Sequence, residues 1–60
     1  MNLFDKVVTK KSFTDKEICA GEQGTVVYLH DGGRSITVEF IDEEGHILAM
    51  VTDIADSFSR

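Results

Sequence analysis

Two histidines are the side chains best suited to hold a metal ion in this chain. His30 and His46 each adjoin an expected turn, and imidazole is a common zinc ligand. The chain between them is expected to be extended, at about 3.3 Å per residue. This separation predicts two exposed histidines at opposite ends of a hairpin and no metal site.

Cys19 is the only cysteine, so the chain forms no internal disulfide and no cysteine-based zinc site. A cysteine nucleophile needs a neighbouring histidine or a helix N-terminus to activate it. Neither adjoins Cys19 in the sequence, which lies between Ile18 and Ala20. We therefore expect a small buried thiol in an apolar setting.

Three consecutive acidic residues, Asp42, Glu43 and Glu44, are a candidate calcium site. They lack the twelve-residue loop of alternating oxygen ligands that calcium loops use, so we expect a solvated turn. Carboxylates that act in acid–base catalysis need a cleft that raises one pKa. A chain of 60 residues leaves little volume for such a pocket. The prediction is a protein that is not an enzyme and has no catalytic residues, cofactor or metal.

The composition is that of one small folded domain spanning residues 1–60, with 42% hydrophobic residues and no proline. The longest apolar run, residues 47–51, is far shorter than the roughly 20 residues of a membrane span. The first residues show no basic region followed by a long apolar stretch, as a signal peptide would. We therefore expect a cytoplasmic protein with no membrane contact.

The charge is unevenly distributed along the chain, whose net charge is −5. Residues 1–20 carry four lysines and three acidic residues, whereas residues 21–60 carry two arginines and eight acidic residues. Nucleic-acid affinity depends mainly on neutralising phosphates, so this balance argues against nucleic acid as a partner. The acidic excess of residues 21–60 has two interpretations. It either keeps the protein soluble or complements a basic surface on a partner protein.

Four runs rich in β-branched residues predict strands, at residues 5–10, 25–29, 35–40 and 47–52. Glycine-containing turns at residues 30–34 and 42–45 join the last three into an antiparallel meander. Residues 12–20 are read as a loop with at most one helical turn, and residues 54–58 as a short 3-10 turn.

Period-two alternation predicts which side chains face the core. The expected core residues are Val7, Ile18, Val26, Tyr28, Ile36, Val38, Phe40, Leu48, Met50 and Ile54, with Phe4 and Phe58 closing the ends. The register of the second and fourth strands is ambiguous, so Val27, Leu29, Ala49 and Val51 form an alternative inward set. Tyr28 has a second interpretation, as an aromatic contact residue if it is exposed.

A glycine motif then gives the fold a more specific form. Gly21-Glu22-Gln23-Gly24-Thr25-Val26-Val27 resembles the KOW-type signature that opens a small SH3-like barrel. The whole chain resembles a family of short bacterial proteins, domain of unknown function 4926. The shared pattern includes Leu3-Phe4-Asp5, the Asp31-Gly32-Gly33 turn, Val38-Glu39-Phe40 and Asp42-x-x-Gly45. The resemblance implies an all-β, five-stranded, partly open SH3-like barrel with a short 3-10 turn near the C-terminus.

The leading functional hypothesis is a non-catalytic interaction module that binds a basic protein partner. The resemblance implies an antitoxin-like or immunity-like role, because members of such families are often encoded in small bacterial or mobile-element cassettes, some of them beside toxin-like genes. The expected contact residues are Glu39, Asp42, Glu43, Glu44 and Tyr28. The alternative is an RNA- or ribosome-associated KOW-like module that uses Lys6, Lys10, Lys11 and Lys16. The same lysines are also expected to protect an exposed first strand from edge pairing, and a homodimer is a further option.

Overall fold

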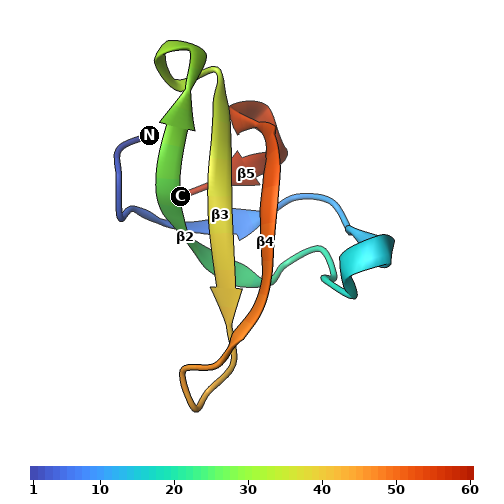
Figure 1. The fold of residues 1–60 in the computed structure, drawn as a ribbon. Coiled ribbons are helices and arrows are strands. Elements are labelled where there is room, and N and C mark those ends of the chain that lie inside the picture. The colour runs from blue at the N-terminus through green and yellow to red at the C-terminus, as the bar shows by residue number, and fades with distance from the viewer.

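The computed structural model describes all 60 residues as one curled antiparallel sheet (Figure 1). Its strands are β1 (Lys6–Thr9), β2 (Gln23–His30), β3 (Ser35–Ile41), β4 (Ile47–Ile54) and β5 (Phe58–Ser59). The strand order is β4-β3-β2-β1-β5. In Figure 1, β2, β3 and β4 run side by side in front, while β1 and β5 cross behind them. The five strands form a half-barrel of the SH3-like kind, which confirms the predicted fold class.

The only helical segments are three short 3-10 turns: η1 (Thr14–Lys16), η2 (Asp31–Gly33) and η3 (Ala55–Ser57). No helix is long and apolar enough to cross a membrane. The predicted turns are confirmed at both hairpins, where Gly32, Gly33 and Gly45 have positive φ. β1 was expected to be an exposed edge, and this is wrong, because it pairs with β2 on one side and β5 on the other.

β3 supplies the centre of the core. Ile36, Val38 and Phe40 are at most 1% exposed, and Thr37 and Glu39 between them lie on the opposite face of the sheet, where Thr37 is also buried. This alternation is the one predicted, because a strand sends successive side chains to opposite faces. The other buried apolar residues come from several elements and close around β3: Val7, Ile18, Val26, Val51 and Phe58.

A register shift in β2 makes the core assignment of Tyr28 wrong. The pairing of β2 with β3 shifts between Val26 and Tyr28, and this β-bulge turns Tyr28 to the outer face, 60% exposed. Val27 is half-buried and Leu29 is 41% exposed, so the alternative set is also wrong for β2.

β4 takes the alternative register. Val51 pairs with Val38 and is buried, and Ala49 is half-buried against the core. The core assignment of Leu48, Met50 and Ile54 is therefore wrong, since all three are more than 40% exposed.

Two further core expectations are also wrong. Phe4 was expected to close one end of the barrel, but it is 73% exposed, whereas Phe58 is buried as predicted. Cys19 was expected to be buried between apolar neighbours, but it is exposed on the loop between β1 and β2. Only Ile18, the residue before it, reaches the core.

Candidate protein-interaction face

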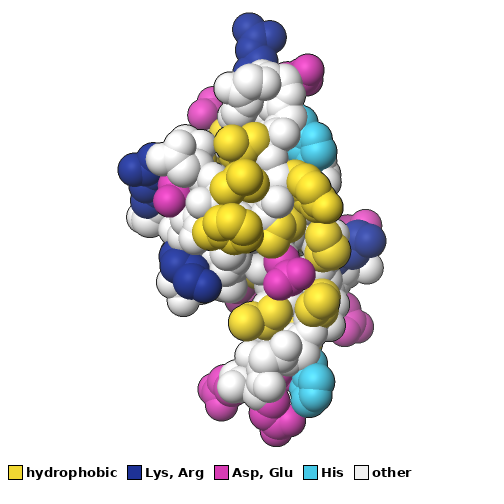
Figure 2. Space-filling view, turned by 60° about the vertical axis from the view of Figure 1, so that its left-hand side comes forward, with side chains coloured by type: hydrophobic (Ala, Val, Ile, Leu, Met, Phe, Trp, Pro, Cys, Tyr) yellow, Lys and Arg dark blue, Asp and Glu magenta, His cyan; other side chains and the backbone are white.

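The outer face of β2, β3 and β4 carries large apolar side chains in contact with solvent. We call this the exposed sheet face and define it by Tyr28, Glu39, Ile41, Met50 and Ile54. The four apolar members are between 44% and 60% exposed. Figure 2 shows hydrophobic side chains gathered along one side of the molecule, with an acidic side chain among them. Monomeric domains rarely keep a contiguous apolar patch exposed unless it serves an interaction.

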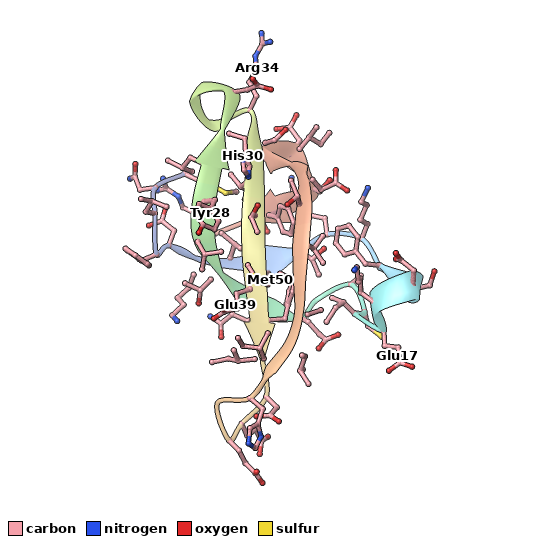
Figure 3. The ribbon with its side chains drawn as sticks, viewed as in Figure 1. Glu17, Tyr28, His30, Arg34, Glu39 and Met50 are labelled. Carbon is pink, nitrogen blue, oxygen red and sulfur yellow. The ribbon has the colours of Figure 1, made fainter.

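The strand register arranges this face in rows. One row places Tyr28 beside Thr37 and Thr52, and the next places Glu39 beside Met50. Figure 3 shows Tyr28, Glu39 and Met50 over adjacent parts of the three strands. The sheet backbone, not a mobile loop, therefore sets the spacing between these side chains.

A chain of hydrogen bonds crosses the middle of the face. The ring nitrogen Nε2 of His30 lies 2.8 Å from Oγ1 of Thr37, which lies 2.7 Å from Oγ1 of Thr52. The ring of Tyr28 lies 6.3 Å from that of His30. His30 is exposed as predicted, but it is also tied to the sheet by this contact. These bonds join β2, β3 and β4 and hold the face in one shape.

Glu39 is the one acidic side chain within the exposed sheet face. It is half-buried between Thr25 and Met50, its cross-strand neighbours, and none of the ion pairs includes it. Lys6 lies two strands away, on β1, and donates a hydrogen bond to Thr25 Oγ1 at 2.9 Å. A carboxylate beside apolar groups and without a cation is a favourable contact point for a partner's arginine or lysine.

The acidic turn lies at one end of the same β3–β4 hairpin, and Asp42 organises it. Oδ1 of Asp42 accepts the backbone N–H groups of Glu44 and His46, each at 2.9 Å. The N–H of His46 is the main cause that holds the pKa of Asp42 below its usual value. Asp42 therefore shapes the turn, whereas Glu43 and Glu44 project into solvent.

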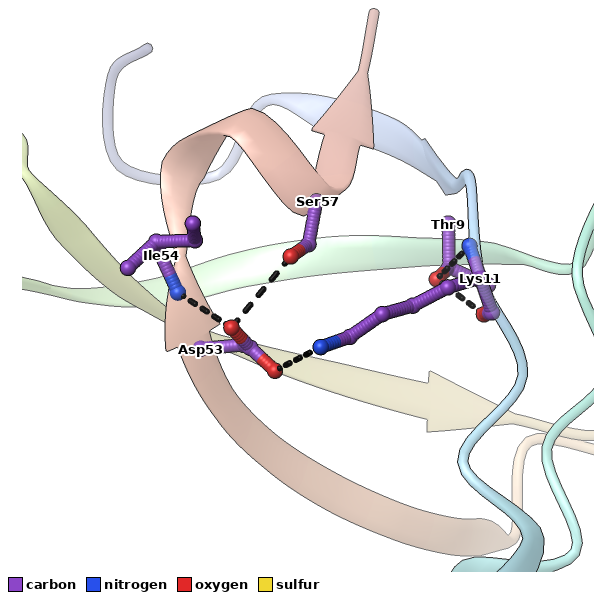
Figure 4. A network of polar contacts seen from close by, with 5 residues as sticks. All are labelled: Thr9, Lys11, Asp53, Ile54 and Ser57. Atoms are coloured by element: carbon purple, nitrogen blue, oxygen red, sulfur yellow. Dashed lines mark hydrogen bonds and ion pairs between the residues drawn. The ribbon is translucent and has the colours of Figure 1, made fainter.

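A polar network away from the exposed sheet face includes Lys11, one of the four lysines of residues 1–20 (Figure 4). Lys11 Nζ lies 2.8 Å from Asp53 Oδ2, while Asp53 Oδ1 accepts the N–H of Ile54 and the hydroxyl of Ser57. The hydrogen bond from Lys11 is the main reason that the pKa of Asp53 is lowered. This network ties the end of β4 to the loop after β1, so Lys11 is engaged within the fold.

The structure brings together some of the predicted contact residues. Tyr28 and Glu39 share the exposed sheet face, and the acidic turn extends from the same hairpin. Met50 and Ile54 were missed as contact residues because their strand is apolar on both faces, which hides which side is open. The surface holds no pocket, and no group of three or more His, Cys, Asp or Glu side chains is placed to hold a metal.

The fold and this face define a small SH3-like half-barrel with an open, mixed apolar and acidic sheet surface. The chain belongs to the family described as domain of unknown function DUF4926, whose model matches residues 3–59. The family resemblance predicted from the glycine motif and the turns is thereby confirmed. No curated protein and no solved structure matches the chain.

Proposed function

We propose that this protein is a non-catalytic interaction module whose exposed sheet face binds a basic protein partner. The observation that carries the proposal is Glu39, a carboxylate without an ion pair beside Met50 and on the same face as Tyr28. Covering such a face with an apolar surface alone would leave a desolvated, unpaired charge. A partner that presents a cation to Glu39 and apolar groups to its neighbours satisfies both features.

The charge of the surrounding hairpin supports a basic partner. No lysine or arginine occurs between Ser35 and Ser59, a stretch that contains Glu39 and the acidic turn of Asp42, Glu43 and Glu44. A one-signed surface of this kind steers an oppositely charged protein and speeds its association at low salt. We place this interaction in the cytoplasm, where a single exposed cysteine stays reduced. An antitoxin-like or immunity-like neutraliser of a basic protein fits these properties.

The competing function is RNA binding through the lysines. Lys11 already pairs with Asp53, and Lys6 donates to Thr25. Lys10 and Lys16 are exposed, but they are too few to provide the phosphate contacts on which such binding depends. RNA binding is therefore an outcome that the experiment must separate from protein binding.

The test compares two charge reversals in capture experiments from the cells that make the protein. Glu39→Lys inverts the charge within the exposed sheet face, and Glu17→Lys makes the same change beside η1, away from that face (Figure 3). We expect the wild type and Glu17→Lys to retain a basic protein at about 0.1 M salt and to lose it at about 0.5 M. Glu39→Lys should lose it at both.

Equal capture by the two variants would show that the face is not the binding surface. A gel shift with host RNA, performed on the same samples, identifies the competing function. If RNA is bound and no protein is retained, the proposal is wrong.

A further inference from the structure

β4 is an edge strand, because it pairs with β3 and with no other strand. The N–H of Ala55 donates to the carbonyl of Arg34 at 2.8 Å. Ala55, the residue just after β4, therefore directs its N–H toward the β3 side of the ladder. In an antiparallel ladder, alternate residues direct both backbone groups to the same neighbour. Val51 and Asp53 therefore bond to β3, whereas Met50, Thr52 and Ile54 direct their N–H and C=O groups away from the sheet.

Both ends of this edge are blocked, and its middle is open. At one end the N–H of Ile54 is taken by Asp53 Oδ1 at 2.7 Å. At the other end the register shifts between Phe40 and Ile41, and such an irregularity interrupts further pairing. The open groups are those of Met50 and Thr52, which are also exposed on the sheet face. Proteins usually block an entire edge against pairing, so a short open stretch beside a candidate contact face points to a binding use.

We propose that the partner adds an extended basic segment to β4 as a further strand of the sheet. This inference rests on the proposed function and specifies how the partner binds. Alternate side chains of the added strand would continue the exposed sheet face next to Met50, within reach of Glu39. Backbone hydrogen bonds to Met50 and Thr52 would supply affinity, and Glu39 would select a basic side chain.

The charge of the hairpin decides between a foreign segment and a second copy of this chain. A second copy paired at the same edge would bring another hairpin without a lysine or arginine, together with its own Glu39 and acidic turn. That arrangement leaves both copies of Glu39 without a cation. An extended segment with basic residues at alternate positions supplies the cation and the strand together.

The test is an NMR titration of the whole chain with a ten-residue peptide that alternates arginine with valine. We expect chemical-shift changes and slowed hydrogen exchange at the amides of Met50 and Thr52. A matched peptide that alternates glutamate with valine should produce neither effect. Met50→Pro should weaken peptide binding at least tenfold, because it removes an N–H that faces away from β3 and so spares the existing ladder. Met50→Ala keeps that N–H and should bind much more tightly than the proline variant.

Other outcomes would overturn the inference in distinguishable ways. Shift changes confined to Tyr28 and Glu39, and unaffected by Met50→Pro, would mean that the face binds without strand addition, so the proposed function would stand alone. The absence of any chemical-shift change at millimolar peptide would also refute strand addition. The capture experiment with Glu39→Lys tests the proposed function independently of this result. Self-association that Met50→Pro abolishes would identify a second copy as the occupant. If Met50→Pro fails to fold, an arginine–valine peptide methylated at alternate backbone nitrogens tests the same bonds, and unchanged affinity would refute the inference.

Discussion

Gly24 is the residue at which the curvature of the sheet depends on the absence of a side chain. A Cβ built there would collide with Val38 Cγ1 and would lie 3.0 Å from the carbonyl oxygen of Glu39. The absence of a side chain at Gly24 therefore lets the backbone of β2 approach Val38 and Glu39 of β3 closely. Gly21, three residues earlier in the motif, serves a different purpose, since its φ is +96° and the space around it is open.

This difference predicts unequal costs for two alanine substitutions. Gly24→Ala should lower the free energy of unfolding by about 1–3 kcal/mol, because the packed core must shift to admit the methyl group. Gly21→Ala should cost about 1 kcal/mol, from backbone strain alone. Urea titrations of both variants measure the two values. A Gly24→Ala variant as stable as the wild type would contradict the close packing of β2 on β3.

At the scale of the element, the buried face of a strand can be predicted from the sequence only when its two faces differ clearly in polarity. β3 alternates apolar and polar residues, so its core residues follow directly from the sequence. β4 carries apolar residues on both faces, and only its pairing of Val51 with Val38 decides which face is buried. β2 alternates up to Val26, but its bulge reverses the pattern. The exposed sheet face was therefore predicted only in part. Glu39 and Tyr28 were named as contact residues, but Tyr28 was also assigned to the core, as were Met50 and Ile54, and Ile41 was assigned to neither.

The corner where β4 meets η3 should contribute a pH-dependent part of the stability. The pKa of Asp53 is lowered in the folded protein, chiefly by Lys11, so its ionised form is favoured by folding. This contribution is fully present above the unfolded pKa of about 3.9 and is lost as the pH falls through the lower folded value. Asp53→Asn should cost about 1 kcal/mol at pH 7, and the difference from the wild type should shrink as the pH falls below about 3.9.

Chemical denaturation of both proteins between pH 7 and pH 2 measures this difference. Asp56→Asn is the matched control, since Asp56 lies in the same corner, is exposed and forms no ion pair. A stability difference for Asp53→Asn that persists unchanged to pH 2 would exclude the ion pair as its cause.

At the scale of the whole molecule, the half-barrel is closed by very few residues. β5 contains only Phe58 and Ser59, yet it pairs with β1 and brings Phe58 into the core. The ring of Phe58 stacks on that of Phe13 at 6.1 Å, so the end of the chain also holds the loop after β1. A 60-residue domain without disulfides has a small margin of stability, and one large side chain is a substantial part of it.

Phe58→Ala and Phe4→Ala should therefore differ sharply, although the sequence alone assigned both residues to closing the barrel. Deletion of a buried phenylalanine ring costs about 3–5 kcal/mol, comparable with the whole stability of so small a domain. We expect Phe58→Ala to be largely unfolded at 25 °C, whereas Phe4→Ala, at a side chain 73% exposed, should change stability by less than about 0.5 kcal/mol. Thermal melts followed by circular dichroism compare the two. A cooperative melt of Phe58→Ala within a few degrees of the wild type would mean that β1 to β4 hold the sheet together without β5.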